Sequence, residues 1–549
     1  MKLHRQFAGL FLIAVIALLL RTYRITQVPP SLNWDEVSIG YNAYSVLKTG
    51  RDEWGVKWPL HFQSYGEYKL PVQIYASIPA IAVFGLNPLG VRITPVIYGT
   101  LTILILFFLV QELFKRFSLS LVTSFLLAIS PWHIQLTRAS FESSFSLFWV
   151  LLGMWWLVKG INGKKYWWII AAVPFAISFY TYNSARVFTP LFLLVVGLVF
   201  IKIFLKNFKA SLLAGLLFTS LLLPAVPFIL SGEASARYKL VSIANEAGLV
   251  PRINERRGLS KLPPPLPRLI HNKVTYISFY MVQSYLAHFT PNFLFNKGAG
   301  HVQHHVGGMG ELYKFQAPFL IFGLYLIFRK KEQYRWFLVV WLLLAFVPVA
   351  TTRDSIPNAL RTVIANPVYQ ILTAYGLISI YGFLEKKRFR NIFLIGLLVI
   401  GLLEITGYLR NLFEVYPVRY ARDWQYGNRE VAEYIKENYD KYDLIVYTRA
   451  YGEPHMFTLF YLAYPPERYF NNSNLVRFKS FDWVWVTHFD KFYFPNLSDK
   501  GTGYWDIVNQ NPGKSILFIG KEDDFQPDKP RLKTINFLDG SRAFDIVAK

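Results

Sequence analysis

The sequence predicts an α-helical polytopic membrane protein with about eleven transmembrane helices, followed by a soluble C-terminal α/β domain. Hydrophobic residues make up 53% of the 549 residues and charged residues only 17%, against the roughly 25% charged residues of average soluble domains. Apolar runs such as Phe7–Leu20 and Ile392–Leu403 are nearly free of charge. They fall in windows close to the roughly 20 residues that a helix needs to cross a bilayer.

The net charge of +24 is distributed unevenly along the chain. Residues 421–549 carry 17 basic and 18 acidic residues, so the whole excess of positive charge lies before them. Much of it occupies short loops between apolar runs, as the positive-inside rule requires of cytoplasmic loops. This pattern argues against a nucleic-acid partner, which would require a basic patch on a folded surface.

Placing these basic loops in the cytoplasm fixes the topology. The predicted spans are 7–21, 91–113, 118–136, 141–158, 166–181, 187–205, 210–230, 315–328, 336–350, 362–383 and 392–409. The N-terminus is then cytoplasmic, the first span is a retained signal anchor, and the C-terminal domain is extracytoplasmic. We expect Leu70–Leu86, which is short and contains two prolines, to be a helix in the outer membrane interface.

The predicted domains are residues 1–419, which form the membrane module with outer loops at about 22–90 and 231–314, and residues 420–549. The second domain contains an amphipathic helix at 430–436, strands near 443–448, 483–487 and 515–519, and a hairpin around Asp539-Gly540. The chain has no cysteine, which excludes disulfides, thiolate metal sites and a cysteine nucleophile.

The strongest candidate for chemistry is Asn33-Trp34-Asp35-Glu36, about a dozen residues beyond the first span. Its loop also contains Glu67 and Lys69. A transfer to a hydroxyl group needs a base that takes the proton of the attacking oxygen, and a carboxylate can do this. The alternative for these residues is a solvated loop or a helix cap.

A second group of candidates is basic. Lys69, Arg138, Arg186 and Arg361 stand at predicted outer span ends, where they either bind a phosphate or extend toward lipid headgroups. Arg138 precedes Glu142 by four residues, a spacing that equally allows a local ion pair on one helix face.

Further polar residues complete the set of candidates. Residues that we expect to line a substrate cavity are Glu142, Glu67, Tyr65, Tyr182 and His305. His305 belongs to His301-Val-Gln-His304-His305, whose spacing fits no strong metal motif, so hydrogen bonding within the loop is the alternative to a metal site.

Together these features resemble the GT-C glycosyltransferases, specifically the protein O-mannosyltransferase and aminoarabinose transferase group, also described as glycosyltransferase family 39-like. The resemblance covers most of residues 20–385. Its motifs are Asp35-Glu36, Lys69-Leu-Pro71-Val, Phe84-Gly85 with Arg92, Ser130-Pro131 with Arg138 and Glu142, and Arg361 with Pro367 and Ala374-Tyr-Gly-Leu. The chain departs from the family at Lys69-Leu-Pro71, which lacks the first proline, and it has no recognisable β-trefoil insert.

The resemblance implies that Asp35 is the catalytic base and that Glu36 supports it or the acceptor. It also implies that Lys69, Arg138 and Arg361 hold the phosphate of a polyprenyl-phosphate sugar donor, and we expect Arg186 to contact the same phosphate. Such enzymes usually invert the anomeric centre. The acceptor is a protein hydroxyl, a lipid or a glycan; no cofactor is required, although a divalent metal is compatible with the family.

Two other classes of protein remain open from the sequence. A transporter or flippase of lipid-linked sugars would show inverted repeats and polar groups at mid-bilayer, whereas these spans are apolar through their middles. A non-catalytic scaffold of glycan assembly would tolerate neutralisation of Asp35.

Overall fold

The computed structural model describes residues 2–481, 483–497 and 503–549. The chain packs into two compact units, which are described separately. The first comprises Met1–Arg21, Val96–Thr137 and Phe141–Leu409, and the second Thr22–Pro95, Arg138–Ser140 and Arg410–Lys549. This division follows packing, whereas the predicted boundary at residue 420 follows composition.

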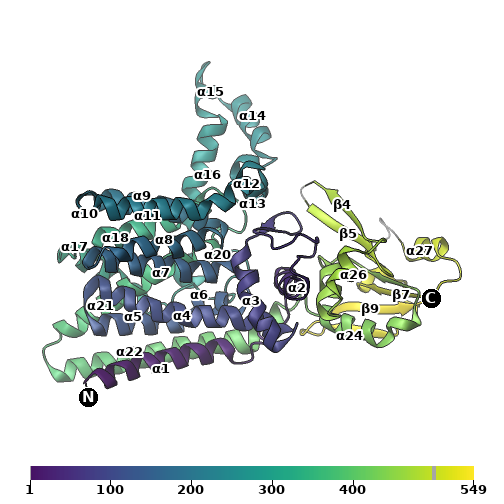
Figure 1. Ribbon diagram of the computed structural model, residues 1–549, viewed down its shortest axis with the longest axis horizontal. Coiled ribbons are helices and arrows are strands. Elements are labelled where there is room, and N and C mark those ends of the chain that lie inside the picture. The colour runs from purple at the N-terminus through teal and green to yellow at the C-terminus, as the bar shows by residue number, and fades with distance from the viewer. Residues whose placement is uncertain (1, 482, 498–502) are drawn as a thin grey trace. The chain divides into compact units, whose positions relative to one another are not determined.

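The first unit is built of helices, most of which run roughly parallel to one another (Figure 1). Its longer helices are α1 (Lys2–Thr22), α4 (Pro88–Phe114, which starts in the second unit), α5 (Phe117–Ile129), α6 (Pro131–Arg138), α7 (Glu142–Asn162), α8 (Tyr166–Phe179), α9 (Asn183–Val199), α11 (Phe208–Leu222), α14 (Leu249–Leu259), α16 (Lys273–Ala287), α17 (Gln316–Arg329), α18 (Arg335–Ala345), α21 (Asn366–Phe383) and α22 (Lys387–Arg410). Short helical segments join them, namely α10 (Ile201–Lys206), η1 (Leu223–Ala225), α12 (Val226–Leu230), η2 (Glu233–Ser235), α13 (Ala236–Val241), η3 (Ile243–Asn245), α15 (Leu266–Ile270), η4 (Asn292–Asn296), α19 (Val347–Ala350), α20 (Ala359–Thr362) and η5 (Val363–Ala365).

The protein is a multi-pass membrane protein. Among the described residues, five helical segments are long and apolar enough to cross a membrane, and a bent pair makes a sixth. They are Pro88–Phe114, Glu142–Asn162, Phe208–Leu230, Ala359–Phe383, Lys387–Arg419 and the pair Phe117–Ile129 with Pro131–Arg138. The other five predicted spans coincide with shorter apolar helices, so the count of eleven remains a prediction.

One predicted span is not a single straight helix. The segment expected at 118–136 is broken at Ser130-Pro131, and its two halves, α5 and α6, meet at 56°. Proline lacks the N–H of a helical hydrogen bond and its ring clashes with the preceding turn, which explains the bend. The bend directs α6 away from the axis of α5.

Two glycines set the closest helix contact of the first unit. A Cβ atom on Gly323 of α17 would lie 1.9 Å from the carbonyl oxygen of Leu372, and one on Gly376 of α21 would lie 2.0 Å from that of Phe319. Only residues without a side chain allow the two backbones to approach so closely, as is usual between membrane helices. Gly376 belongs to the motif Ala374-Tyr-Gly-Leu, which therefore has a packing role.

The second unit combines the loop after α1 with the C-terminal region. Its helical elements are α2 (Trp34–Thr49), α3 (Pro71–Phe84), η6 (Asn411–Val415), α23 (Tyr416–Arg419), α24 (Asn428–Asn438), η7 (Tyr439–Lys441), α25 (Pro454–Tyr461), α26 (Pro466–Phe470), α27 (Tyr504–Gln510) and η8 (Glu522–Asp524). Its strands are β1 (Phe62–Gln63), β2 (Tyr68–Lys69), β3 (Leu444–Tyr447), β4 (Val476–Ser480), β5 (Trp483–Phe489), β6 (Phe492–Tyr493), β7 (Ile516–Gly520), β8 (Lys533–Asn536) and β9 (Arg542–Ala548). The predicted helix at 70–86 is confirmed as α3.

Seven strands form one mixed sheet in the order β4-β5-β6-β3-β7-β9-β8. Strand β3 pairs in parallel with β6 and β7, and the remaining pairs are antiparallel. The predicted amphipathic helix, strands and C-terminal hairpin are confirmed as α24, β3, β5, β7 and β8–β9. Asp539-Gly540 is not a two-residue turn, however, because it lies in a five-residue loop closed by the Phe537 N–H donating to the Ser541 carbonyl at 2.8 Å.

Helix α2 is buried in the second unit rather than solvated. Its apolar residues share one core with α25 and the sheet, including Val37, Tyr41 and Phe460. A Cβ atom on Gly40 would lie 2.6 Å from the Phe460 ring and 2.7 Å from Val91. Glycine at position 40 thus allows α2 to approach its neighbours closely enough to hold a fixed orientation.

Candidate functional site

The site in the second unit begins at the first turn of α2. Asn33 is the N-cap residue, and its side-chain oxygen accepts a hydrogen bond from the Glu36 N–H at 2.9 Å. The Glu36 carboxylate in turn accepts from the Asn33 N–H at 3.3 Å, which completes a capping box. Asp35 therefore occupies the first turn of a helix, where the helix dipole favours a negative charge.

Asp35, Glu67 and Lys69 form one charged cluster. The Lys69 ammonium lies 2.7 Å from Asp35 Oδ1 and 3.0 Å from Glu67 Oε1. The Lys69 side chain is 5% exposed, whereas that of Asp35 is 35% exposed. Because β2 carries Lys69 and pairs with β1, the ammonium is fixed beneath an accessible carboxylate.

Glu36 has a different environment from its neighbour. Its side chain is fully buried and forms two hydrogen bonds of 2.9 Å with the Arg92 guanidinium. Glu36 Oε1 also accepts from the Ser140 N–H at 3.0 Å. A carboxylate whose oxygens are all engaged in this way stabilises a fold and has no free oxygen for a substrate proton.

Two buried arginines hold the segment that leads into α2. Arg92 donates to the carbonyl oxygens of Ile25 and Pro29 at 3.1 and 2.8 Å. Arg138 donates to those of Tyr23 and Val28 at 2.8 and 2.7 Å. Both side chains are 0% exposed. The structure thus gives Arg138 hydrogen bonds that position the loop, and its contact with a donor phosphate stays a prediction.

Aromatic side chains surround the exposed side of this turn. The Tyr65 hydroxyl donates to the Trp34 carbonyl at 2.8 Å, and the Tyr65 ring stacks on Trp483 with centroids 5.7 Å apart. The Trp34 and Trp483 rings lie 6.0 Å apart. Burial, together with the charges of Glu453, Glu53 and Asp35, raises the pKa of Tyr65 well above its ordinary value. Tyr65 is therefore a neutral hydrogen-bonding group.

A cavity of about 520 Å³ also lies in the second unit. Its wall includes Arg24, Ser31, Leu32, Arg429 and Glu430, so it borders the segment that Arg92 holds. None of Asp35, Glu67 and Lys69 lines it.

Arg361 is the centre of a separate charged group in the first unit. Its guanidinium donates to Asp354 Oδ2 and Thr352 Oγ1, both at 2.9 Å, and is 9% exposed.

The His301 and His304 rings stack with centroids 4.3 Å apart. Burial, reinforced by the neighbouring His301 and Arg361 side chains, lowers the pKa of His304 well below its ordinary value.

His305 is part of the same loop but is turned inward. Its Nδ1 lies 3.0 Å from the His301 carbonyl oxygen, and its side chain is buried. Burial lowers its pKa from the ordinary value of 6.5. His305 thus has a polar contact within its loop, and its place in a substrate cavity stays a prediction.

Glu142, Arg186 and Tyr182 are also near one another in the first unit. Glu142 opens α7 and interacts electrostatically with Arg186 of α9, and Tyr182 caps the N-terminus of α9. Arg186 donates to the Phe179 carbonyl oxygen at 3.2 Å and lies over the Phe179 and Phe228 rings, 5.3 Å from each centroid. Glu142 therefore interacts with Arg186, and the ion pair of Glu142 with Arg138 stays a prediction.

The described parts of the chain contain no group of three or more His, Asp or Glu side chains that could hold a metal ion. The divalent metal that the family resemblance allows thus has no protein ligand set among these residues.

The structure brings together Asp35, Glu67 and Lys69 of the first loop. It also brings Arg361 near His304 of the histidine loop. Sequence reasoning missed the partner of Glu36, although Arg92 was part of the family motif. A signal was available, since Arg92 is a charge at the start of a long apolar run and such charges generally have a buried partner.

Comparisons with known proteins concern the family and the fold of the chain. The family described as dolichyl-phosphate-mannose-protein mannosyltransferase matches residues 71–228, and curated protein sequences give no significant match. ArnT from Cupriavidus metallidurans bound to undecaprenyl phosphate is similar in structure, with a TM-score of 0.51, 13% identity and coverage of 100% of this chain and 98% of that one. The Archaeoglobus fulgidus oligosaccharyltransferase in its apo form gives a TM-score of 0.51 at 14% identity, over 84% of this chain and 64% of that one.

A second form of the oligosaccharyltransferase, tethered to an acceptor peptide, gives a TM-score of 0.50 at 16% identity, over 84% of this chain and 63% of that one. This chain thus spans less than two thirds of the length of the archaeal enzyme. At these identities the likeness concerns the fold. With the family match, it confirms that the chain resembles the GT-C membrane glycosyltransferases of the protein O-mannosyltransferase and aminoarabinose transferase group.

Proposed function

We propose that this protein transfers a sugar from a polyprenyl-phosphate donor to a hydroxyl-bearing acceptor on the extracytoplasmic face of a membrane, with Asp35 as the catalytic base. The observation that carries the proposal is the half-buried Asp35 carboxylate on the first turn of α2, 2.7 Å from Lys69. The family match and the fold support the reaction class.

In the proposed reaction the acceptor oxygen attacks the anomeric carbon as Asp35 accepts the proton of the hydroxyl group. The bond from the anomeric carbon to the phosphate oxygen breaks, and polyprenyl phosphate leaves with the bonding electrons. A single displacement of this kind inverts the anomeric centre.

We assign the neighbouring charges distinct roles. Lys69 holds Asp35 in place and faces the developing negative charge, a task for which a preorganised cation is suited. Glu36 and Arg92 keep the first turn of α2 in position. Arg361 and Arg186 remain proposed contacts of the donor phosphate. Arg186 is half-buried, and Arg361 is buried beside the half-exposed Asp354.

The proposed membrane topology follows from the basic loops. Eleven spans with a cytoplasmic N-terminus would place residues 22–90, 231–314 and 420–549 on the extracytoplasmic side. The membrane that the protein spans would be the plasma or inner membrane of the cell. We propose that the sheet of the second unit contributes to acceptor binding, because Trp483 of β5 stacks on Tyr65, close to Asp35 in the same unit.

A transfer assay tests the proposal. It combines purified protein in lipid with a panel of labelled polyprenyl-phosphate sugars, and native membrane extract supplies the acceptor. Wild type should transfer at least one sugar, and Asp35→Asn should lose transfer while keeping its unfolding temperature. Glu67→Gln is the matched control, because Glu67 contacts the same ammonium but is assigned no proton transfer.

Equal transfer by wild type and Asp35→Asn would remove Asp35 as the base. Absence of transfer from every donor would favour the transporter or scaffold alternatives instead.

A further inference from the structure

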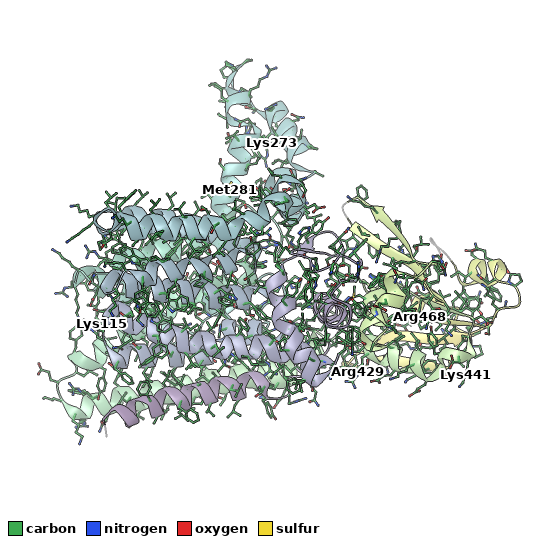
Figure 2. All side chains as sticks on the ribbon, viewed as in Figure 1. Lys115, Lys273, Met281, Arg429, Lys441 and Arg468 are labelled. Carbon is green, nitrogen blue, oxygen red and sulfur yellow. The ribbon has the colours of Figure 1, made fainter. Side chains whose placement is uncertain are left out.

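Helices α14, α15 and α16 form a hairpin that projects from the first unit. Figure 1 shows these helices leaving the packed helices at a steep angle, roughly across their common direction. In Figure 2 Met281 lies near the base of the projection and Lys273 farther out. Since transmembrane helices stay within about 40° of the bilayer normal, a hairpin across them runs along the membrane plane.

The contacts at the base of the hairpin indicate its depth relative to the membrane. The Ile243 N–H donates to the Thr351 carbonyl oxygen at 3.1 Å, and His288 Nε2 accepts from the Asn358 N–H at 2.8 Å. Residues 351–358 connect α19 to α20, so they lie at the end of a candidate span. The hairpin therefore leaves the unit at the depth of a membrane–water interface.

The hairpin has a defined fold of its own. Arg252 of α14 donates to the Tyr280 hydroxyl of α16 at 2.7 Å, and Arg257 donates to the His271 carbonyl oxygen at 2.6 Å. Ile253 is 4% exposed between the two helices. These contacts keep α14 beside α16, so the hairpin is an ordered element.

Many large apolar side chains are exposed on the hairpin. Leu269 is 65% exposed, Val274 75% and Phe279 63%, and Leu259, Leu266 and Leu286 are exposed as well. Such a concentration of large apolar side chains on one projecting element requires cover by lipid or protein.

The charge of the hairpin indicates whether lipid or protein covers its apolar side chains. Residues 249–287 contain six basic residues and one acidic residue, a net charge of +5. Arg256, Lys261, Arg268 and Lys273 are exposed beside the apolar side chains. Apolar and basic side chains on a helix that lies in the membrane plane are the combination that binds anionic lipid surfaces.

We propose that residues 249–287 form a membrane-surface anchor. Their apolar side chains enter the lipid leaflet beside the spans, and Arg256, Lys261, Arg268 and Lys273 bind phosphate-bearing anionic headgroups. This anchor is independent of the proposed transferase activity.

The absence of cysteine in the chain makes the test direct. Single substitutions Leu269→Cys, Val274→Cys and Phe279→Cys of the full-length protein are labelled with an environment-sensitive fluorophore and reconstituted into vesicles. One vesicle type contains phosphatidylcholine alone and the other also contains phosphatidylglycerol. Trp505→Cys on α27, 55% exposed and far in sequence, is the aqueous control, and Leu216→Cys on α11 is the lipid-facing control.

We expect the three hairpin probes to show blue-shifted emission and quenching by a lipid-attached quencher, as Leu216→Cys does, with more quenching when phosphatidylglycerol is present. The combined substitution Arg256→Gln, Arg268→Gln and Lys273→Gln should remove the increase due to phosphatidylglycerol. Probes that behave like Trp505→Cys would overturn the proposal. So would a blue shift that grows with the protein-to-lipid ratio, which would assign the surface to a second copy, or quenching that is equal in both vesicle types.

Discussion

The two sides of the first turn of α2 differ more than their sequence suggests. Asp35 and Glu36 are adjacent acids, each paired with one basic residue. The pair of Asp35 with Lys69 is part exposed, whereas that of Glu36 with Arg92 is fully buried and bonded to main-chain groups as well. The comparison teaches that adjacent acids can divide into one accessible residue, which is our proposed base, and one buried residue that holds the structure.

The difference has an energetic basis. A part-exposed ion pair contributes little to stability, because water competes for both partners. A buried pair contributes little over an apolar pair, but removing one partner leaves an uncompensated charge at a large cost. Substitution on the exposed side should therefore affect activity, and substitution on the buried side stability.

The largest expected effect is that of Asp35→Asn on turnover. Loss of a general base typically lowers the rate by about 10²- to 10⁴-fold, and we expect a loss of this size in the transfer assay. The unfolding temperature in detergent should stay within the range of Glu67→Gln. A comparable loss in Glu67→Gln would mean that the two acids do not differ in role.

Arg92→Gln should break the buried side. Because Glu36 would be left charged and unpaired, the free energy of opening of α2 should fall by about 3–5 kcal/mol, measured by hydrogen exchange of its amide groups. The double substitution with Glu36→Gln should recover part of this loss. If opening is unchanged in the single variant, the buried pair does not hold the turn.

Lys69→Met sharpens the exposed side. Removing hydrogen bonds to a charged group costs about 1.5–3 kcal/mol, so we expect turnover to fall by roughly 10- to 100-fold, with a smaller effect on unfolding than in Arg92→Gln. Lys69→Arg, which keeps the charge, should retain more activity. Equal activity of both variants would show that the charge of Lys69 does not contribute to turnover.

Arg361→Gln extends the comparison to the part-exposed ion pair of the first unit. If its guanidinium binds the donor phosphate, the apparent KM for the donor should rise by about tenfold, the value of one charged hydrogen bond. Asp354→Asn is the control, because it removes the partner at 2.9 Å and keeps the cation. An unchanged KM in Arg361→Gln would restrict Arg361 to the structure of its loop.

Another acid of the same loop, Glu53, extends the comparison to the dependence of stability on pH. Burial raises the pKa of Glu53 from 4.5 to about 8. The folded state therefore holds this proton more tightly than the unfolded state does, and stability decreases as pH rises from about 4.5 through about 8. Glu53→Gln should flatten the pH dependence of the unfolding temperature and raise that temperature above pH 8. An unaltered slope would show that Glu53 is already ionised in the folded protein.

The sequence by itself determined the broad class of the protein. Hydrophobic runs, basic loops and the change of composition near residue 420 predicted helices in the membrane and a mixed α/β region after them, since both patterns are local. Local signals also placed α3, α24 and β8–β9. They did not predict the bend at Pro131, because the apolar composition continues across it. A span bent at a proline therefore has the same hydrophobic pattern as a straight one.

Only the tertiary structure decided which residues meet. Arg92 reaches Glu36 over 56 positions, and Arg138 bonds to the carbonyls of Tyr23 and Val28. No local pattern encodes such pairs, because burial of a charge depends on which elements pack around it. The sequence therefore named Asp35 and Lys69 as candidates, but packing alone distinguished an accessible carboxylate from its buried neighbour.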